Sequence, residues 1–150
     1  MLRQFANLTV DADGRYATDR ELQFLDSYFD TYELRLSAYL KIRDSAKEII
    51  EKVRLGKQKR NPEFQDFYAT CKRDLIDLLR YNAAALLFDD LERLRTNMLL
   101  WFQTIARAYT FEEDNNDTYD VLLKVIPEFL TPEEAKVALP VFELNRAVLV

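Results

Sequence analysis

Residues that interrupt helices are rare in this sequence, which contains two glycines and four prolines among 150 residues. Glycine and proline cost the most free energy inside a helix, so a long chain with few of them favours long helices joined by short turns. Apolar side chains recur at three- and four-residue spacing along most of the chain, as on the side of a helix that faces a core. The sequence therefore predicts an all-α fold with about eight helices.

Several helix starts can be read from local sequence. A threonine followed three residues later by glutamate forms a capping box, in which each residue satisfies a free backbone amide of the other. Thr18 with Glu21 and Thr131 with Glu134 have this spacing. Asn61, followed by proline, predicts a third start.

Helix ends and loops are predicted less directly. We expect a break near Asp44, whose side chain would cap the next helix. Gly56 is expected to end that next helix, which would make the basic segment 54–60 an exposed loop or a docking patch for an acidic partner. Residues 111–117 are acidic and polar, and they are expected to form a plain loop.

The composition excludes several classes of function. The chain has no histidine, so it lacks the usual haem ligand and the usual general base of nucleophilic catalysis. Its single cysteine allows neither an internal disulfide nor a structural zinc site. The net charge of −5 argues against nucleic-acid binding, and no apolar run is long enough for membrane insertion. We expect a cytoplasmic protein that is not an enzyme.

The segment around the only cysteine holds the candidate site. Cys71 is followed by Arg73 and Asp74 on a predicted helix. Residues three apart lie on one side of a helix, so the Cys71 thiol and the Asp74 carboxylate would face the same space. Two interpretations remain open at this point. The two side chains could bind a conjugated ligand that carries N–H groups, or their arrangement could be chance, because lone cysteines are usually core residues and Arg-Asp pairs on helices are usually solvated.

Two motifs carry a resemblance to a known family. The segment 69–74, followed by Leu79-Arg80-Tyr81, resembles the bilin-attachment segment of the phycobiliproteins. The segment 11–16, followed by the residues 18–22, is similar to the turn between the N-terminal arm and the first globin helix of that family. The resemblance implies one globin-like domain over residues 1–150, with residues 1–17 as a helical arm and 18–150 as the body, and without haem.

The resemblance also implies roles for individual residues. In the family, the residue at Cys71 forms a thioether to a linear tetrapyrrole (a bilin), the residue at Asp74 accepts hydrogen bonds from pyrrole nitrogens, and the residue at Arg73 pairs with a propionate. The residues at Asp11 and Arg80 form an ion pair between subunits. We therefore expect a homodimer, or a heterodimer with a related globin, that assembles through the arm.

Three functions remain as alternatives. The first is a non-enzymatic globin in bilin handling or the phycobilisome, peripheral to the thylakoid of a photosynthetic cyanobacterium. The short, basic segment before Cys71 makes the chain similar to the divergent globins encoded beside bilin-biosynthesis genes, and we favour this function. The second is a light-harvesting antenna subunit with a covalent bilin at Cys71. The third is a ligand-free globin that serves as a dimerisation or regulatory module.

Overall fold

The computed structural model describes residues 1–60, 68–109 and 112–150, without the side chains of 68–71 and 112–115. Every regular element in these residues is helical, which confirms the predicted all-α class. The elements are α1 (Leu2–Asp11), α2 (Asp19–Asp44), α3 (Ala46–Arg60), α4 (Tyr68–Phe88), α5 (Leu91–Leu94), the π-helical turn η2 (Arg95–Leu99), α6 (Leu100–Ala108), α7 (Glu112–Val125), the 3-10 turn η3 (Ile126–Phe129) and α8 (Pro132–Leu149).

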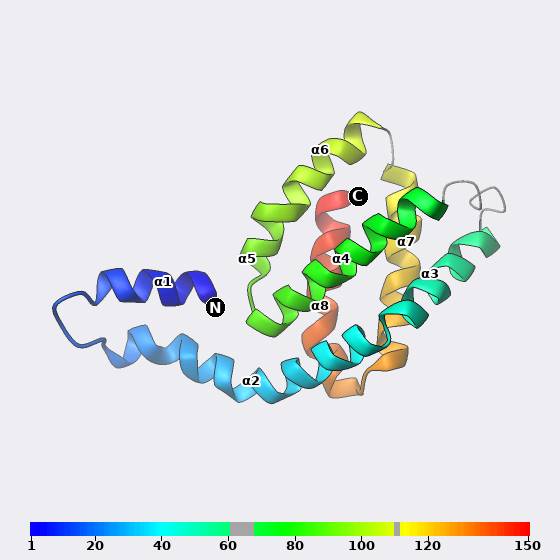
Figure 1. The fold of residues 1–150 in the computed structure, drawn as a ribbon. Helices are drawn as coiled ribbons and strands as arrows, with labels where there is room; N and C mark the ends of the chain where they lie inside the picture. Colours follow the sequence, from blue (N-terminus) through cyan, green and yellow to red (C-terminus); the bar gives the residue numbers. More distant parts are fainter. Residues whose placement is uncertain (61–67, 110–111) are drawn as a thin grey trace.

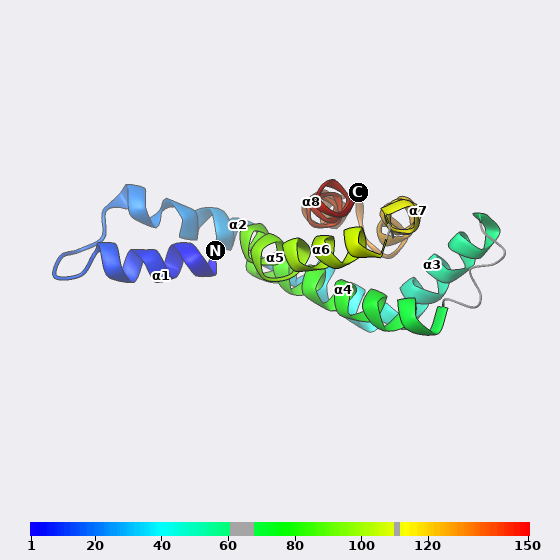
Figure 2. The same cartoon turned by 90° about the horizontal axis from the view of Figure 1, so that it is seen from above.

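The helices form a bundle from which the N-terminal part projects. Helix α1 runs back beside the first half of α2, and together they extend away from the bundle (Figures 1 and 2). Helix α2 packs on α4 and α8, while α7 packs on α3 and α8. The largest fully buried side chains include Ile42 of α2, Leu86 of α4, Tyr119 of α7 and Phe142 of α8. The core therefore lies where these four helices meet, and the projecting part contributes little to it.

Both predicted capping boxes are confirmed. Thr18 accepts a hydrogen bond from the Glu21 amide, and Thr131 accepts one from the Glu134 amide. In each pair the glutamate carboxylate accepts a hydrogen bond from the threonine amide in return. These contacts are local, so the sequence spacing alone was enough to predict them.

The break between α2 and α3 lies at Ser45, one residue beyond Asp44. Asp44 is the last residue of α2, and its carboxylate accepts a hydrogen bond from Arg43 Nε at 2.8 Å. The predicted position of the break was therefore nearly right. Asp44 itself belongs to the helix before the break and not to the start of the next one.

The prediction that Gly56 ends its helix is wrong, because α3 continues through Gly56 to Arg60. A Cβ atom at Gly56 would lie 2.6 Å from Cγ1 of Val121 in α7. The glycine thus allows two helices to approach closely. The basic segment 54–60 therefore belongs to α3 and is not the expected exposed loop. Lys57 within it is buried, and its Nζ donates a hydrogen bond to Thr118 Oγ1 at 2.7 Å.

Two further predictions fall beyond Gly56 in the chain. The expected loop over 111–117 is wrong, since α7 begins at Glu112. The chain from Leu91 to Ala108 is one helical stretch made of α5, η2 and α6, with five π-helical residues in its middle. The predicted cap Asn61 lies outside the described residues.

Candidate functional site

The predicted pigment-binding residues lie in the first turns of α4. The backbone of Cys71 is helical, as predicted, but its side chain is outside the part of the structure that is described. Arg73 and Asp74 are both exposed. The prediction that the Cys71 thiol and the Asp74 carboxylate face one space therefore stays a prediction.

The carboxyl group of Asp74 has an unusual environment for an exposed residue. Partial burial raises its pKa, the neighbouring Asp77 carboxylate raises it further, and Arg73 lowers it. Among the described residues, neither Asp74 nor Arg73 makes a side-chain hydrogen bond or ion pair. One acceptor and one cation, adjacent in sequence, are thus available to a ligand.

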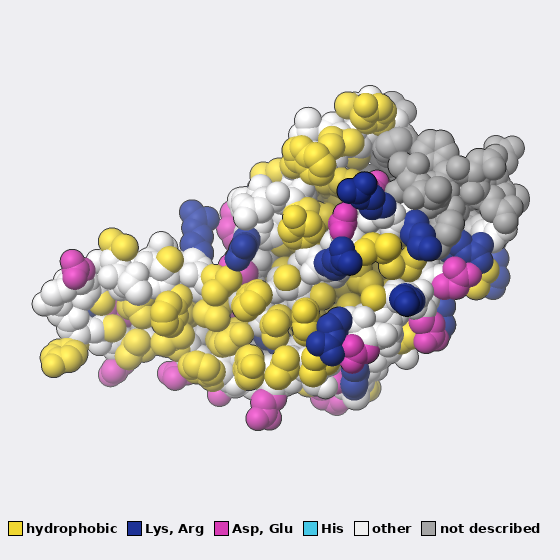
Figure 3. Space-filling view, in the orientation of Figure 1, with side chains coloured by type: hydrophobic (Ala, Val, Ile, Leu, Met, Phe, Trp, Pro, Cys, Tyr) yellow, Lys and Arg dark blue, Asp and Glu magenta, His cyan; other side chains and the backbone are white. Residues whose placement is uncertain are grey.

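The face of α4 that does not carry Arg73 and Asp74 lines a groove, which has the largest volume of the grooves found in the described residues. The groove has a volume of about 750 Å³ and lies between α4 and the elbow where α2 meets α3. Arg80 is one of its lining residues, whereas Arg73 and Asp74 are not. Figure 3 shows Lys and Arg side chains around apolar surface in this region. The sequence did not predict this groove, because its two walls are about 30 residues apart in the chain.

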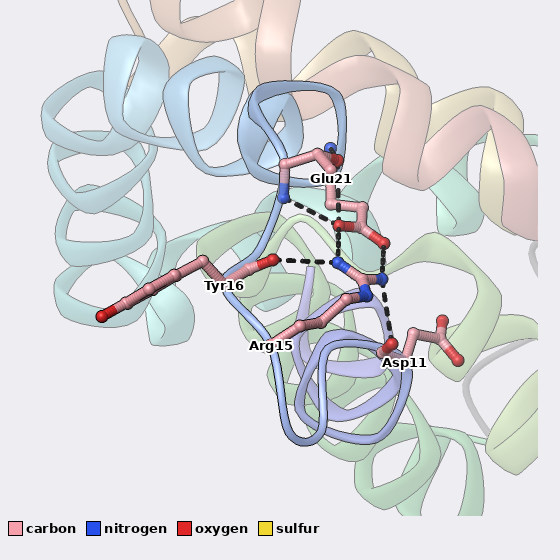
Figure 4. Close-up of polar contacts among 5 residues, drawn as sticks. Asp11, Arg15, Tyr16 and Glu21 are labelled. Atoms are coloured by element: carbon pink, nitrogen blue, oxygen red, sulfur yellow. Dashed lines mark hydrogen bonds and ion pairs between the residues drawn. The ribbon is translucent and has the colours of Figure 1, made fainter.

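The turn between α1 and α2 is held by a compact set of hydrogen bonds (Figure 4). The Arg15 guanidinium donates to the backbone oxygens of Asp11 at 2.9 Å and Tyr16 at 3.0 Å. It also forms two bonds to the Glu21 carboxylate, at 2.7 and 2.9 Å. The bonds from Arg15 and Thr18 lower the pKa of Glu21 to about 2. Arg15 therefore fixes the direction of α1 relative to α2. The sequence did not predict this role for Arg15.

The two residues expected to pair between subunits have different surroundings. Only the backbone oxygen of Asp11 joins the turn described above, and its carboxylate makes no hydrogen bond or ion pair with any described residue. Arg80 is 76% exposed at its side chain and contacts Asp77 one turn earlier on α4, at 3.3 Å. Exposed pairs of this kind contribute little stability, so both charges are available to another chain.

The described residues contain neither a metal-binding group nor a membrane-spanning helix. No group of three or more cysteine or acidic side chains among them could hold a metal ion. None of the helices in the described ranges is long and apolar enough to cross a bilayer.

Comparison with known proteins gives one finding and one negative result. The model of the family described as "Phycobilisome protein" matches residues 7–149. No curated protein matches the chain. The family match includes the turn at Arg15, the whole of α4 and the core, so it covers both regions that hold the candidate residues.

Proposed function

The chain belongs to the phycobilisome protein family, and on that premise we propose that it is a non-enzymatic, phycobiliprotein-like globin that handles bilins or serves the phycobilisome beside the thylakoid. The observation that carries the proposal is the family match over residues 7–149. The all-α fold with its projecting N-terminal hairpin agrees with it.

The residues of α4 fit a bilin in their chemistry. Asp74 is an acceptor with a raised pKa and no partner among the described residues, and it would take the pyrrole N–H groups. Arg73 would pair with a propionate, and Cys71 would hold the pigment through a thioether. When bound, the pigment supplies absorption of visible light.

Bilin attachment can be tested by co-expression with a bilin-producing pathway. We expect the purified protein to be coloured and to fluoresce with zinc on a denaturing gel. Cys71→Ser should abolish the signal on the gel, because the thioether is the only covalent link. Asp74→Asn should keep the covalent signal but shift the absorption band, since the acceptor for the pyrrole N–H groups loses its charge.

Three outcomes separate the functions. A coloured protein that loses its pigment on the denaturing gel supports non-covalent bilin handling. A covalent pigment that depends on Cys71 agrees with the proposed attachment, and assembly of that coloured protein into rings with a related subunit would support the antenna function. A colourless protein in which Cys71 still titrates as a free thiol contradicts both and leaves the ligand-free module.

Within this proposal the protein dimerises through its N-terminal hairpin. No residue of α1 is buried. Phe5 and Val10 of α1 are 48% and 73% exposed, and Phe29 on the adjoining half of α2 is 65% exposed. Apolar side chains gathered on one projecting element are typical of a surface that another chain covers. The carboxylate of Asp11 lies at the end of the same helix.

The dimer contact predicts an effect of Asp11→Ala and Arg80→Ala on association. Each change leaves the opposite charge buried without its partner, which typically costs about 2–5 kcal/mol at an interface. We expect sedimentation to show dissociation constants raised by at least about 30-fold.

Asp13→Ala and Arg107→Ala are matched controls, because both residues are exposed charges on described helices or turns. They should leave association unchanged. Exchange of the charges, Asp11→Arg with Arg80→Asp, should restore the dimer in part. Asp11→Ala and Arg80→Ala proteins that sediment like the unmodified protein would remove this ion pair from the proposal.

A further inference from the structure

The first half of α2 has little burial to hold it against the bundle. Among the described residues Asp19–Ser37, Tyr28 is the only one that is buried, whereas Ala38 and Ile42 in the second half are 0% exposed. The first half extends beyond the bundle together with α1 (Figure 1). A short helical segment with little of its apolar surface covered is only marginally stable in water. The contacts that join this half to the bundle therefore decide whether it stays folded.

Arg35 joins this half of α2 to the end of α4. Its Nη1 donates a hydrogen bond to the backbone oxygen of Leu86 at 3.1 Å, and its Nη2 forms an ion pair with the Asp89 carboxylate at 2.8 Å. A third bond, from Nε to Thr31 Oγ1 at 3.0 Å, holds the guanidinium against its own helix. The Arg35 side chain is 13% exposed, so these bonds are shielded from water and stronger than those of a surface pair.

Tyr28, two turns earlier on α2, contacts the same end of α4. Its hydroxyl donates a hydrogen bond to the backbone oxygen of Leu87 at 3.0 Å. The last four carbonyls of a helix have no partner within that helix, so α2 supplies donors that the end of α4 lacks. Asp89 follows with a φ of 48°, a conformation that side-chain-bearing residues rarely adopt. We call Tyr28 and Arg35, with Leu86, Leu87 and Asp89, the α2–α4 clamp.

We propose that the α2–α4 clamp keeps the projecting half of α2 folded before another chain covers it, which makes Arg35 a positioning residue for association. This inference rests on the dimer contact proposed above. Helix α1, which carries Phe5, Val10 and Asp11, is joined to α2 through the bonds of Arg15, so its position depends on that half of α2. A surface that is ordered in advance binds more tightly, because association then costs less conformational entropy.

Hydrogen exchange of the full chain, at a concentration where sedimentation shows a monomer, tests the clamp itself. In Arg35→Met we expect the amides of residues 19–34 to exchange at least about tenfold faster, the effect of losing one charged hydrogen bond. Tyr28→Phe keeps the ring and should cause a smaller increase in the same amides. Core amides near Ile42 should keep their rates in both variants, which shows that the bundle is folded. If residues 19–34 exchange no faster in Arg35→Met than in Arg107→Met, which replaces an exposed arginine of α6, the clamp is overturned.

Sedimentation of the same variants tests the positioning role. We expect the dissociation constant of Arg35→Met to rise at least about fivefold, because a smaller fraction of chains has the ordered hairpin, and that of Arg107→Met to stay unchanged. Asp11→Ala, in contrast, should weaken association without faster exchange of residues 19–34 in the monomer. Faster exchange with unchanged association in Arg35→Met would overturn the positioning role and leave the dimer contact intact. An unmodified protein that stays monomeric at every concentration would contradict the dimer contact and the positioning role together, while the exchange rates would still decide whether the clamp orders α2.

Discussion

Glu134→Ala should lower the free energy of unfolding by about 3 kcal/mol, because it removes a buried, hydrogen-bonded carboxylate. The Glu134 side chain is 4% exposed. Its oxygens accept hydrogen bonds, each at 2.7 Å, from Ser37 Oγ, Lys41 Nζ and the Thr131 amide. The residue therefore joins α8 to α2 while it caps its own helix.

The measurement is chemical denaturation at neutral pH, with Glu133→Ala as a matched control. Glu133 is an exposed glutamate in the same helical turn, so its replacement removes the charge near the helix start without touching α2. We expect that control to lose at most about 0.5 kcal/mol. If Glu134→Ala and Glu133→Ala unfold at the same denaturant concentration, the contact with α2 contributes nothing.

The same residue predicts a pH dependence. Burial raises the pKa of Glu134, but the hydrogen bonds from Lys41, Thr131 and Ser37 outweigh this and lower it to about 2, from 4.5. The folded-state pKa is below the unfolded one, so this contribution is fully present above pH 4.5 and is lost as the pH falls through about 2. Glu134→Gln should therefore make unfolding less dependent on pH between these values. Equal slopes for Glu134→Gln and the unmodified protein would contradict this.

Gly56→Ala is expected to destabilise the protein by up to about 2 kcal/mol, although alanine favours a helix over glycine by about 1 kcal/mol. The new Cβ would lie 2.6 Å from Cγ1 of Val121, which is 7% exposed. Valine has one strongly preferred rotamer in a helix, so it cannot turn away cheaply. Overpacking of this kind costs about 1–3 kcal/mol, and the gain of about 1 kcal/mol in helix propensity offsets only part of a cost above the low end of that range.

A second variant tests this explanation directly. In a Val121→Ala background the clashing atom is gone, and the remaining Cβ of residue 121 lies at an ordinary 3.6 Å. Gly56→Ala should then stabilise the protein by about 1 kcal/mol, through helix propensity alone. The change of sign between the two backgrounds can be measured in a double-mutant cycle. If Gly56→Ala stabilises the unmodified protein as well, the close approach of α3 and α7 imposes no constraint.

The candidate site was only partly predictable. The position of Cys71, Arg73 and Asp74 on one helix follows from local periodicity, and the helical backbone of α4 agrees with it. The isolation of the Asp74 carboxylate and the separation of Arg73 from the groove depend on which face of α4 the other helices cover. Arg15 was missed because its partners gather only after the chain turns between α1 and α2.

The sequence by itself determined the helical class and both capping boxes, because these depend on contacts within one or two helical turns. It also placed the break after α2 to within one residue. Only the tertiary structure decided that Gly56 continues a helix, since the reason is Val121 of α7, 65 positions later. The tertiary structure likewise decided that Lys57 is buried and that Glu134 joins α8 to α2, because the partners of both residues lie in other helices. A spacing rule cannot reveal such contacts, because the distance between two helices is set by everything packed around them.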